Sequence, residues 1–203
     1  IVAREYGSYP NVIFEIFNEP DPMVGERERT WSDDVKPYAE AALAAVRRHS
    51  SNVAIVGTPW WCQKLDPVLE DPLDDAVNIL YSVHFYAAWQ GHDKIKDDIA
   101  AVAPVLPLFV SEFGHGCPHI ACDVVPSRSA SWIDLLDKYA ISWANWAVFD
   151  KANNSNALLL PGGGYRTRAG DWDGAGADFT QGGLLTRSLI ARNYGNDVDL
   201  VPR

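Results

Sequence analysis

Long apolar runs and clusters of basic residues are both missing from this sequence of 203 residues. No stretch approaches the roughly 18 uninterrupted apolar residues that a membrane-spanning helix needs, so we expect no membrane segment. The 17 Lys and Arg residues are scattered and outnumbered by 27 Asp and Glu, which leaves a formal net charge of −10. Such a chain cannot readily neutralise a phosphate backbone, so nucleic acid is a disfavoured partner. A neutral polymer or a small molecule fits better.

Cysteine is scarce as well, with three residues. Cys117 and Cys122 could form a disulfide that closes a short loop, which would leave Cys62 unpaired. Residues 115–122 also contain two histidines, but the spacing of these four potential ligands matches no standard zinc pattern. A loop disulfide, free thiols and a metal site therefore all stay open.

No glycine-rich phosphate-binding turn follows an apolar run, so the sequence does not predict a dinucleotide site. What it does contain is an alternation of strand and helix patterns. The predicted strands are 12–17, 53–56, 79–83, 108–110 and 141–148, and the predicted helices are 33–49, 94–102, 130–139 and 182–193. Ser32 is the expected cap of the first helix, and the glycine-rich stretch 161–183 is expected to be a long loop.

Apolar strands that alternate with helices indicate a parallel sheet covered by helices, either an open doubly wound sheet or a (β/α) barrel. Polar and aromatic residues gather at or just after the carboxyl ends of the predicted strands: Asn18-Glu19, His84 with Tyr86, Glu112, and Trp146 with Asp150. Functional side chains at the carboxyl ends of several strands are typical of barrel enzymes. A complete barrel has eight strands, however, and five are predicted here.

Two glutamates stand at the tips of apolar strands, Glu19 in Asn18-Glu19-Pro20 and Glu112 in Ser111-Glu112-Phe113. A single glutamate at a strand end is most simply a surface residue. Two of them at the same rim of one sheet are what glycoside hydrolysis requires, because one carboxyl group must deliver a proton while the other is ionised.

Five segments carry a more specific resemblance. The segment YPNVIFEIFNEP (residues 9–20) resembles the acid/base strand of family 5 glycoside hydrolases, the cellulase family. The segments WSDDVKPYAE (31–40), SVHFYA (82–87), PLFVSEFG (107–114) and ISWANW (141–146) follow in the order that this family shows. From about residue 9 to residue 193, the chain is similar to the carboxyl-terminal part of the catalytic domain of a bacterial endo-β-1,4-glucanase.

The resemblance implies a role for each matching residue. Glu19 would be the acid/base and Glu112 the nucleophile of a retaining mechanism. The residues implied to bind substrate or to orient the nucleophile are Asn18, His84, Tyr86, Trp146, Trp61 and Lys151. The ordinary alternatives are a core histidine for His84, a packed loop tryptophan for Trp61 and a solvated lysine for Lys151. No metal and no organic cofactor are expected.

The count of strands places the chain within the barrel. In the resembled clan the acid/base ends strand 4 and the nucleophile ends strand 7, and Glu19 and Glu112 are likewise three predicted strands apart. The five strands would therefore be strands 4 to 8, without strands 1 to 3 and the family's arginine and histidine that they carry. Residues 1–197 are assigned to this partial TIM-barrel domain, and 198–203 to a linker and the remnant of a thrombin-cleaved tag.

The expected activity is hydrolysis of internal β-1,4-glucosidic bonds in a β-glucan polysaccharide, in an extracellular setting. Hydrolysis of another β-glycan, such as mannan or xyloglucan, is the near alternative. An inactive glycan-binding fragment is the alternative from a different class, because five barrel strands leave two unpaired sheet edges. For the same reason we expect the polypeptide to self-associate or to pair with a missing amino-terminal half.

Overall fold

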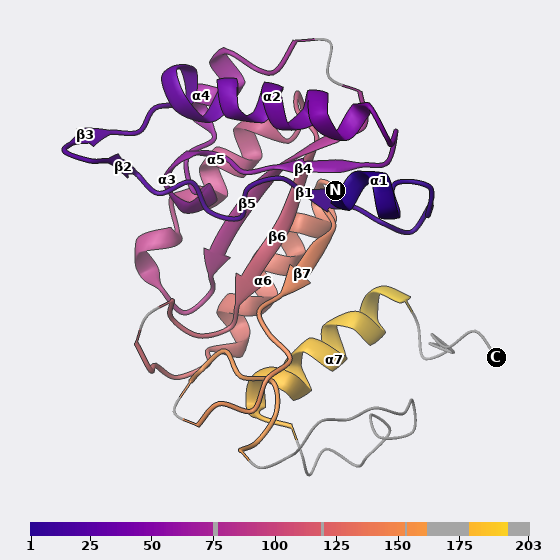
Figure 1. Cartoon of the computed structure of the whole chain (residues 1–203). Coiled ribbons are helices and arrows are strands. Elements are labelled where there is room, and N and C mark those ends of the chain that lie inside the picture. The colour runs from indigo at the N-terminus through magenta and orange to yellow at the C-terminus, as the bar shows by residue number, and fades with distance from the viewer. Residues whose placement is uncertain (75–76, 119, 153, 162–178, 195–203) are drawn as a thin grey trace. The chain divides into compact units, whose positions relative to one another are not determined.

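A five-stranded parallel sheet forms the centre of the fold (Figure 1). The computed structural model describes residues 1–74, 77–118, 120–152, 154–161 and 179–194. The sheet runs in chain order through β1 (Phe14–Glu15), β4 (Ala54–Val56), β5 (Ile79–Tyr86), β6 (Leu108–Gly114) and β7 (Trp143–Asn145). All five predicted strands are confirmed, although β1 is shorter than predicted and β5 and β6 continue further toward their carboxyl ends.

The pairing of the strands identifies the architecture. β1 pairs with β4 in parallel, with Phe14 opposite Ala54, and β4 pairs with β5 in parallel, with Ala54 opposite Ile79. Each strand lies next to its successor in the chain, and the order does not reverse as it does in a doubly wound sheet. The fold is part of a (β/α)8 TIM barrel, as predicted, and the doubly wound alternative is wrong.

The four predicted helices are confirmed as α2 (Lys36–Arg47), α5 (Ile95–Val102), α6 (Pro126–Lys138) and α7 (Gln181–Tyr194). The predicted cap of the first helix is wrong. A π-helical turn, η1 (Trp31–Val35), precedes α2, and its cap is Thr30, whose Oγ1 accepts a hydrogen bond from the backbone N–H of Asp33 at 3.1 Å. Thr30 can do so because its backbone is extended, whereas Ser32 already lies inside the turn.

Several short elements were not predicted. They are α1 (Val2–Tyr6), the hairpin of β2 (Met23–Val24) and β3 (Arg27–Glu28), α3 (Pro59–Cys62), α4 (Asp66–Glu70) and η2 (Gln90–His92). Each is too short to show a periodic apolar pattern in the sequence. Across the part of the chain that the structure describes, no helix is long and apolar enough to cross a membrane.

The hydrophobic core holds the strands and helices together. On β5, Tyr81, Val83 and Phe85 are buried, and on α5 the buried residues Ile95 and Ile99 are four positions apart and share one face. Burial of one such side chain contributes about 1.5–3 kcal/mol relative to its exposure. The core therefore provides a rigid support for the side chains at the carboxyl ends of the strands.

The chain divides into two compact units. The first comprises Ile1–Phe85, His92–Glu112 and Leu135–Ala144, and the second comprises Tyr86–Gly91, Phe113–Asp134 and Asn145–Arg203. Of the predicted loop at 161–183, residues 162–178 lie outside the described part of the chain, as do residues 198–203 of the predicted linker and tag remnant.

Candidate active site

Three predicted site residues meet in the first unit: Glu19 after β1, His84 on β5 and Glu112 on β6. The Oε1 atom of Glu19 lies 2.8 Å from Nδ1 of His84. One carboxylate oxygen of each glutamate and one ring nitrogen of His84 all lie within 4.8 Å of one another. His84 and Glu112 are buried, whereas the Glu19 side chain is 31% exposed. The parallel strands bring these groups together because their carboxyl ends share one edge of the sheet.

Behind this group lies a set of polar side chains that the sequence analysis missed. Nε2 of His84 lies 2.8 Å from Oγ of Ser111, and Ser111 donates a hydrogen bond to Oε1 of Glu15 at 2.6 Å. Oγ of Ser82 lies 2.6 Å from Oγ of Ser111. A signal was present in the sequence, because each of these residues interrupts an otherwise apolar strand. Ser82 and His84 are two positions apart on β5 and so point to the same face of the sheet.

An unusual turn after β4 contacts the segment Asn18–Pro20, which contains Glu19, and carries Trp61. Trp60, Trp61 and Cys62 have φ angles of 56°, 54° and 60°, although none is glycine. Left-handed backbone costs such residues roughly 1–2 kcal/mol each, so the surrounding contacts must stabilise the turn. The backbone N–H of Trp61 donates to the carbonyl oxygen of Pro20 at 3.0 Å, and Sγ of Cys62 donates to that of Asn18 at 3.1 Å.

The turn gives its two tryptophans different surroundings. Nε1 of Trp60 donates to Oε1 of Glu28 at 2.9 Å, and the ammonium group of Lys64 lies 4.5 Å from the centre of the Trp60 ring. Trp61 meets Trp60 edge-on and is 39% exposed. Trp61 is therefore the more exposed tryptophan of this turn, and its contact with a sugar stays a prediction.

The other three predicted site residues belong to the second unit. Tyr86 is buried and packs against Gly114, where an added Cβ would collide with the Tyr86 ring and with Asn156. Trp146 is 48% exposed, and its backbone N–H donates to the carbonyl oxygen of Phe113 at 2.7 Å. Lys151 is exposed. Their contacts with the nucleophile or with a sugar stay predictions.

The cysteine-containing loop lies in the same unit, and Cys117 and Cys122 form a disulfide. Of the three alternatives left open by the sequence, the loop disulfide is therefore confirmed, and Cys62 is a free, buried thiol. Asn156 anchors the loop, since its Oδ1 accepts from the backbone N–H of Gly116 and its Nδ2 donates to the carbonyl oxygen of Cys117, both at 2.8 Å.

His115 precedes this loop and is not free to bind a metal. Its Nδ1 lies 2.9 Å from Oγ of Ser129 and its Nε2 lies 2.8 Å from Oγ1 of Thr186, all three side chains being buried. Burial lowers the pKa of His115 to about 4, because the charged imidazolium loses its hydration. The other histidine of the segment, at position 119, lies outside the described residues.

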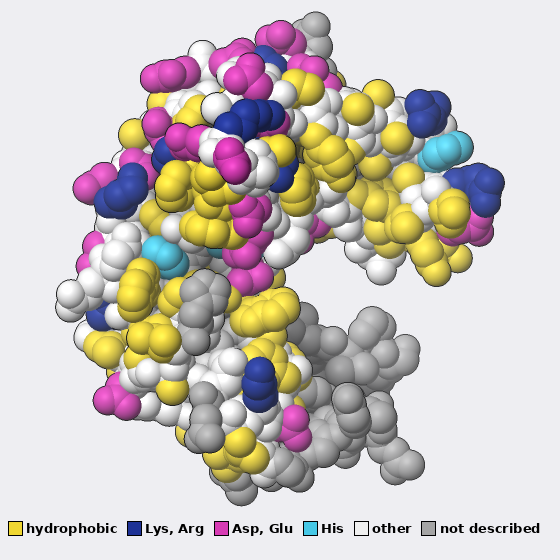
Figure 2. Space-filling model, turned by 60° about the vertical axis from the view of Figure 1, so that its left-hand side comes forward, with side chains coloured by type: hydrophobic (Ala, Val, Ile, Leu, Met, Phe, Trp, Pro, Cys, Tyr) yellow, Lys and Arg dark blue, Asp and Glu magenta, His cyan; other side chains and the backbone are white. Residues whose placement is uncertain are grey.

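Glu19, His84 and Glu112 offer enough ligand atoms to hold a divalent cation, since two carboxylates and an imidazole are common ligands. The expectation that no cofactor is needed stays a prediction. Figure 2 shows one face of the molecule, on which Asp and Glu side chains lie among hydrophobic ones and Lys and Arg are scattered. The described residues of this face therefore form no basic patch of the kind that binds a phosphate backbone.

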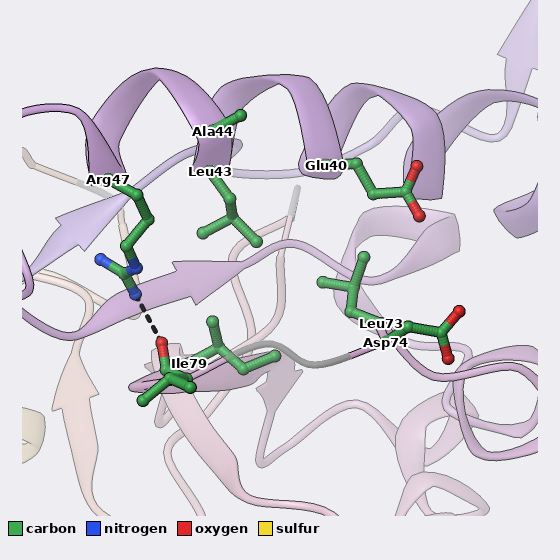
Figure 3. A pocket seen from close by; sticks show the side chains of 8 residues that line it. Glu40, Leu43, Ala44, Arg47, Leu73, Asp74 and Ile79 are labelled. Atoms are coloured by element: carbon green, nitrogen blue, oxygen red, sulfur yellow. Dashed lines mark hydrogen bonds between the residues drawn. The ribbon is translucent and has the colours of Figure 1, made fainter.

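A separate pocket of about 450 Å³ lies in the first unit, between α2 and the start of β5 (Figure 3). Leu43 and Ile79 line it, and Arg47 closes one side by donating to the carbonyl oxygen of Val77 at 2.8 Å. None of the predicted site residues lines this pocket. It is a hollow between packed elements and does not contribute to the group around Glu19.

Comparison with known proteins identifies the family. The sequence model of Cellulase (glycosyl hydrolase family 5) matches residues 1–152. The chain belongs to glycoside hydrolase family 5. Among its relatives, Endoglucanase A of Evansella cellulosilytica and an endoglucanase of Clostridium saccharobutylicum are each 36% identical to it, over 186 and 197 residues. A solved structure, the catalytic domain of the endoglucanase Cel5A of Thermobifida fusca in complex with cellotetraose, is 25% identical, with a TM-score of 0.76.

The family 5 chain covers only part of these relatives. The two sequence alignments include 91% and 93% of the chain but 36% and 40% of the relatives' lengths. The structural match includes 93% of the chain and 60% of the Thermobifida fusca domain. Family membership is thus shown for a chain that spans about two fifths of the curated relatives' length.

Proposed function

We propose that this family 5 chain carries the two catalytic carboxylates of a retaining endo-β-1,4-glucanase. The observation that carries the proposal is the approach of Glu19 and Glu112, which have carboxylate oxygens within 4.8 Å of each other. Retaining glycosidases place their carboxyl groups about 5–5.5 Å apart, whereas inverting ones leave about 6.5–9.5 Å for a water molecule. The spacing supports direct attack by one glutamate.

In the first step Glu112 attacks the anomeric carbon, and the bond from that carbon to the glycosidic oxygen breaks. Glu19 gives its proton to the departing oxygen, so the products are a glycosyl ester on Glu112 and a free sugar hydroxyl. In the second step Glu19 takes a proton from water, the resulting hydroxide attacks the same carbon, and the ester bond to Glu112 breaks. The more buried Glu112 and the more accessible Glu19 suit a nucleophile and a proton-transferring residue, respectively.

The remaining site residues are proposed to bind the glycan. Asn18 would hydrogen-bond a sugar hydroxyl beside the nucleophile, and Tyr86 would orient the nucleophile. Trp61 and Trp146, which are both exposed, would stack on the apolar faces of sugar rings. Lys151 would bind a further sugar. The bound cellotetraose of the Thermobifida fusca structure supports a β-1,4-glucan as the substrate class.

Because the chain spans 60% of that domain, we propose that activity also requires barrel strands that complete the sheet. They would come from an amino-terminal half or from association with another copy. An extracellular location suits a polymeric substrate that cannot enter a cell, and no cofactor takes part in the scheme. An inactive, glycan-binding fragment is the alternative if those strands are absent.

The test is hydrolysis of carboxymethyl-cellulose by the intact gene product and by Glu112→Gln. Loss of a nucleophile should lower kcat by at least about 10³-fold, since covalent catalysis supplies much of the acceleration. Glu26→Gln, in the exposed turn between β2 and β3, is the matched control and should keep full activity. Undiminished hydrolysis by Glu112→Gln would refute the proposal.

Three further measurements separate the alternatives. NMR of the first-formed product reports whether the anomeric configuration is retained, and an inverted product would refute the double displacement. A panel with mannan and xyloglucan decides between β-glycans. Treatment with a chelator tests the metal alternative, because a reaction performed by the carboxylates alone should be unaffected.

A further inference from the structure

The hairpin of β2 and β3 projects from the first unit, and Glu28 stands at the end of its second strand (Figure 1). Oε1 of Glu28 accepts hydrogen bonds from Nε1 of Trp60 at 2.9 Å and from the ammonium group of Lys64 at 3.3 Å. These two hydrogen bonds lower the pKa of Glu28, so its carboxylate is ionised at neutral pH and acts only as an acceptor. Glu28 has no part in the reaction scheme above.

The hairpin is also fixed on its other side. The guanidinium group of Arg27 donates two hydrogen bonds to the carboxylate of Asp34 in η1, at 2.8 and 2.6 Å. Nε of Arg29 donates to the carbonyl oxygen of Asp21 at 2.7 Å. Successive side chains of a strand point to opposite faces, so Arg27 binds η1 while Glu28 binds the turn after β4. Because a bidentate pair fixes geometry as well as adding attraction, Glu28 is presented from a rigid support.

The contacts of Trp60 suit an anchor better than a surface for a sugar. Its N–H is bound to Glu28, and the ammonium group of Lys64 lies over its ring, 4.5 Å from the centre. Trp61 meets the same ring edge-on, with the two ring centres 6.0 Å apart. Trp61 is the more exposed of the two, at 39%. The turn thus carries one tryptophan that is held by the hairpin and another that is accessible to a ligand.

The position of Trp61 depends on contacts of two kinds. Its backbone N–H donates to the carbonyl oxygen of Pro20, the residue directly after Glu19, at 3.0 Å. This bond fixes the backbone but leaves the ring free to rotate about its side-chain bonds. The ring contacts the indole of Trp60, and both residues have left-handed backbone that surrounding contacts must stabilise. A change that releases Trp60 therefore also releases the ring of Trp61.

We propose that Glu28 is a positioning residue that, by holding Trp60, fixes the ring of Trp61 in the orientation in which it stacks on a sugar ring of the β-glucan. This inference rests on the proposed function of Trp61 as a sugar-stacking residue, and it gives the β2–β3 hairpin a part in substrate binding. A side chain that is already ordered loses less conformational entropy when it meets its ligand, so affinity is higher. The contribution is to binding, and it should appear in KM.

The first experiment observes the two tryptophans directly and requires no turnover. The indole N–H signals in the NMR spectrum of the wild-type chain are assigned with Trp60→Phe and Trp61→Phe. Glu28→Ala should move the Trp60 signal, because its acceptor is lost. It should also move and broaden the Trp61 signal, because the neighbouring Trp60 ring no longer holds one place. Glu28→Gln keeps an oxygen that accepts from Trp60 and should leave the Trp61 signal in place.

The second experiment measures kcat and KM for cellohexaose with the intact gene product. Glu28→Ala and Trp60→Phe should each raise KM by about three- to tenfold, the factor that corresponds to one hydrogen bond at its net strength. The value of kcat should change little, since binding is lost equally in the ground state and the transition state. A merely structural effect would reduce the fraction of active protein, which lowers kcat and leaves KM in place. Glu28→Gln and the control Glu26→Ala should keep the wild-type KM.

A double substitution tests whether Glu28 acts through Trp61. In a Trp61→Ala background, Glu28→Ala should not raise KM further, because the ring that it positions is absent. An equal rise in KM with and without Trp61 would show that Glu28 acts on the substrate by another route, and it would overturn the inference.

Two other results would also overturn it. They are a Trp61 indole signal that is unchanged in Glu28→Ala, and a wild-type KM in both Glu28→Ala and Trp60→Phe. If Glu28→Ala fails to fold, Trp60→Phe, which keeps an aromatic ring but has no N–H to donate, provides the same decision. Absence of hydrolysis by the wild-type protein would refute the proposed function, while the NMR result would still decide whether Glu28 holds Trp61.

Discussion

The thiol of Cys62 donates a hydrogen bond to the carbonyl oxygen of Asn18, with the two atoms 3.1 Å apart. This contact joins the left-handed turn after β4 to the segment that leads from β1 into Glu19. Burial raises the pKa of Cys62 to about 12, so the thiol keeps its proton and remains a donor at any physiological pH. The contact therefore supports both the backbone next to Glu19 and the turn that presents Trp61.

Cys62→Ala should destabilise the protein by about 1–2 kcal/mol, because it removes this hydrogen bond and leaves a small cavity at a fully buried site. Urea unfolding of the two proteins measures the difference. In the folded protein a thiol reagent should modify Cys62 slowly, and unfolding should make the reaction fast. Rapid modification without unfolding would contradict the burial of this residue.

Gly114→Ala should destabilise by about 1–3 kcal/mol, since the added methyl group collides with the Tyr86 ring and the Asn156 side chain. Gly182→Ala is a matched control. The nearest atom to its added Cβ would be 3.5 Å away, and the position lies in α7, where alanine is favoured over glycine by up to about 1 kcal/mol. Thermal unfolding compares the two variants. Equal melting temperatures would show that Gly114 has room for a side chain.

His115 should make the protein less stable as the pH falls. Its pKa is about 4 in the folded protein against an ordinary 6.5, so the unfolded chain takes up a proton first. The stabilisation from a neutral His115 is complete above pH 6.5 and is lost as the pH falls toward 4. Between pH 7 and pH 5 this group alone should cost about 2 kcal/mol.

Urea unfolding at the two pH values measures this loss, and His115→Gln is the control. Glutamine can still hydrogen-bond Ser129 or Thr186 but does not titrate, so the variant should lose less stability between the two pH values. An identical loss in both proteins would assign the pH dependence to other groups.

Replacement of both Cys117 and Cys122 by serine should destabilise by about 2 kcal/mol, because the disulfide closes a short loop and removes little entropy from the unfolded chain. The hydrogen bonds from Asn156 would keep the loop near its position. Reductant should lower the melting temperature of the wild-type protein and leave the double variant unchanged. Sensitivity of the double variant to reductant would contradict this assignment.

Much of the architecture was predictable because it depends on local patterns. The five strands and four main helices follow from runs of apolar residues and from helical periodicity. The position of Glu19 and Glu112 at the tips of parallel strands placed both at one rim of the sheet. The boundaries were less predictable. Thr30 replaced Ser32 as the helix cap because a π-helical turn, which has no sequence signature of its own, precedes α2.

The candidate site was predictable only in part. Glu19 follows β1, His84 and Glu112 lie near the carboxyl ends of β5 and β6, and the three side chains meet at one edge of the sheet. Glu15 and Ser111 were missed, because the sequence alone does not show which side chain a polar residue inside a strand contacts. The turn at Trp60 to Cys62 was missed for a different reason. Its residues have a left-handed backbone, but it contains no glycine, the residue that normally indicates such a conformation in a sequence.

The sequence by itself determined the order of the elements, the residue types at the strand ends and, through its motifs, the family. Those properties are local, because they do not depend on how the strands and helices pack against one another. Tertiary structure alone decided that Cys117 bonds to Cys122, that Nδ1 of His84 faces Glu19, and that Ser111 connects His84 to Glu15. Each depends on distances between residues far apart in the sequence or on the direction of a side chain, and only the packing of strands and turns determines these.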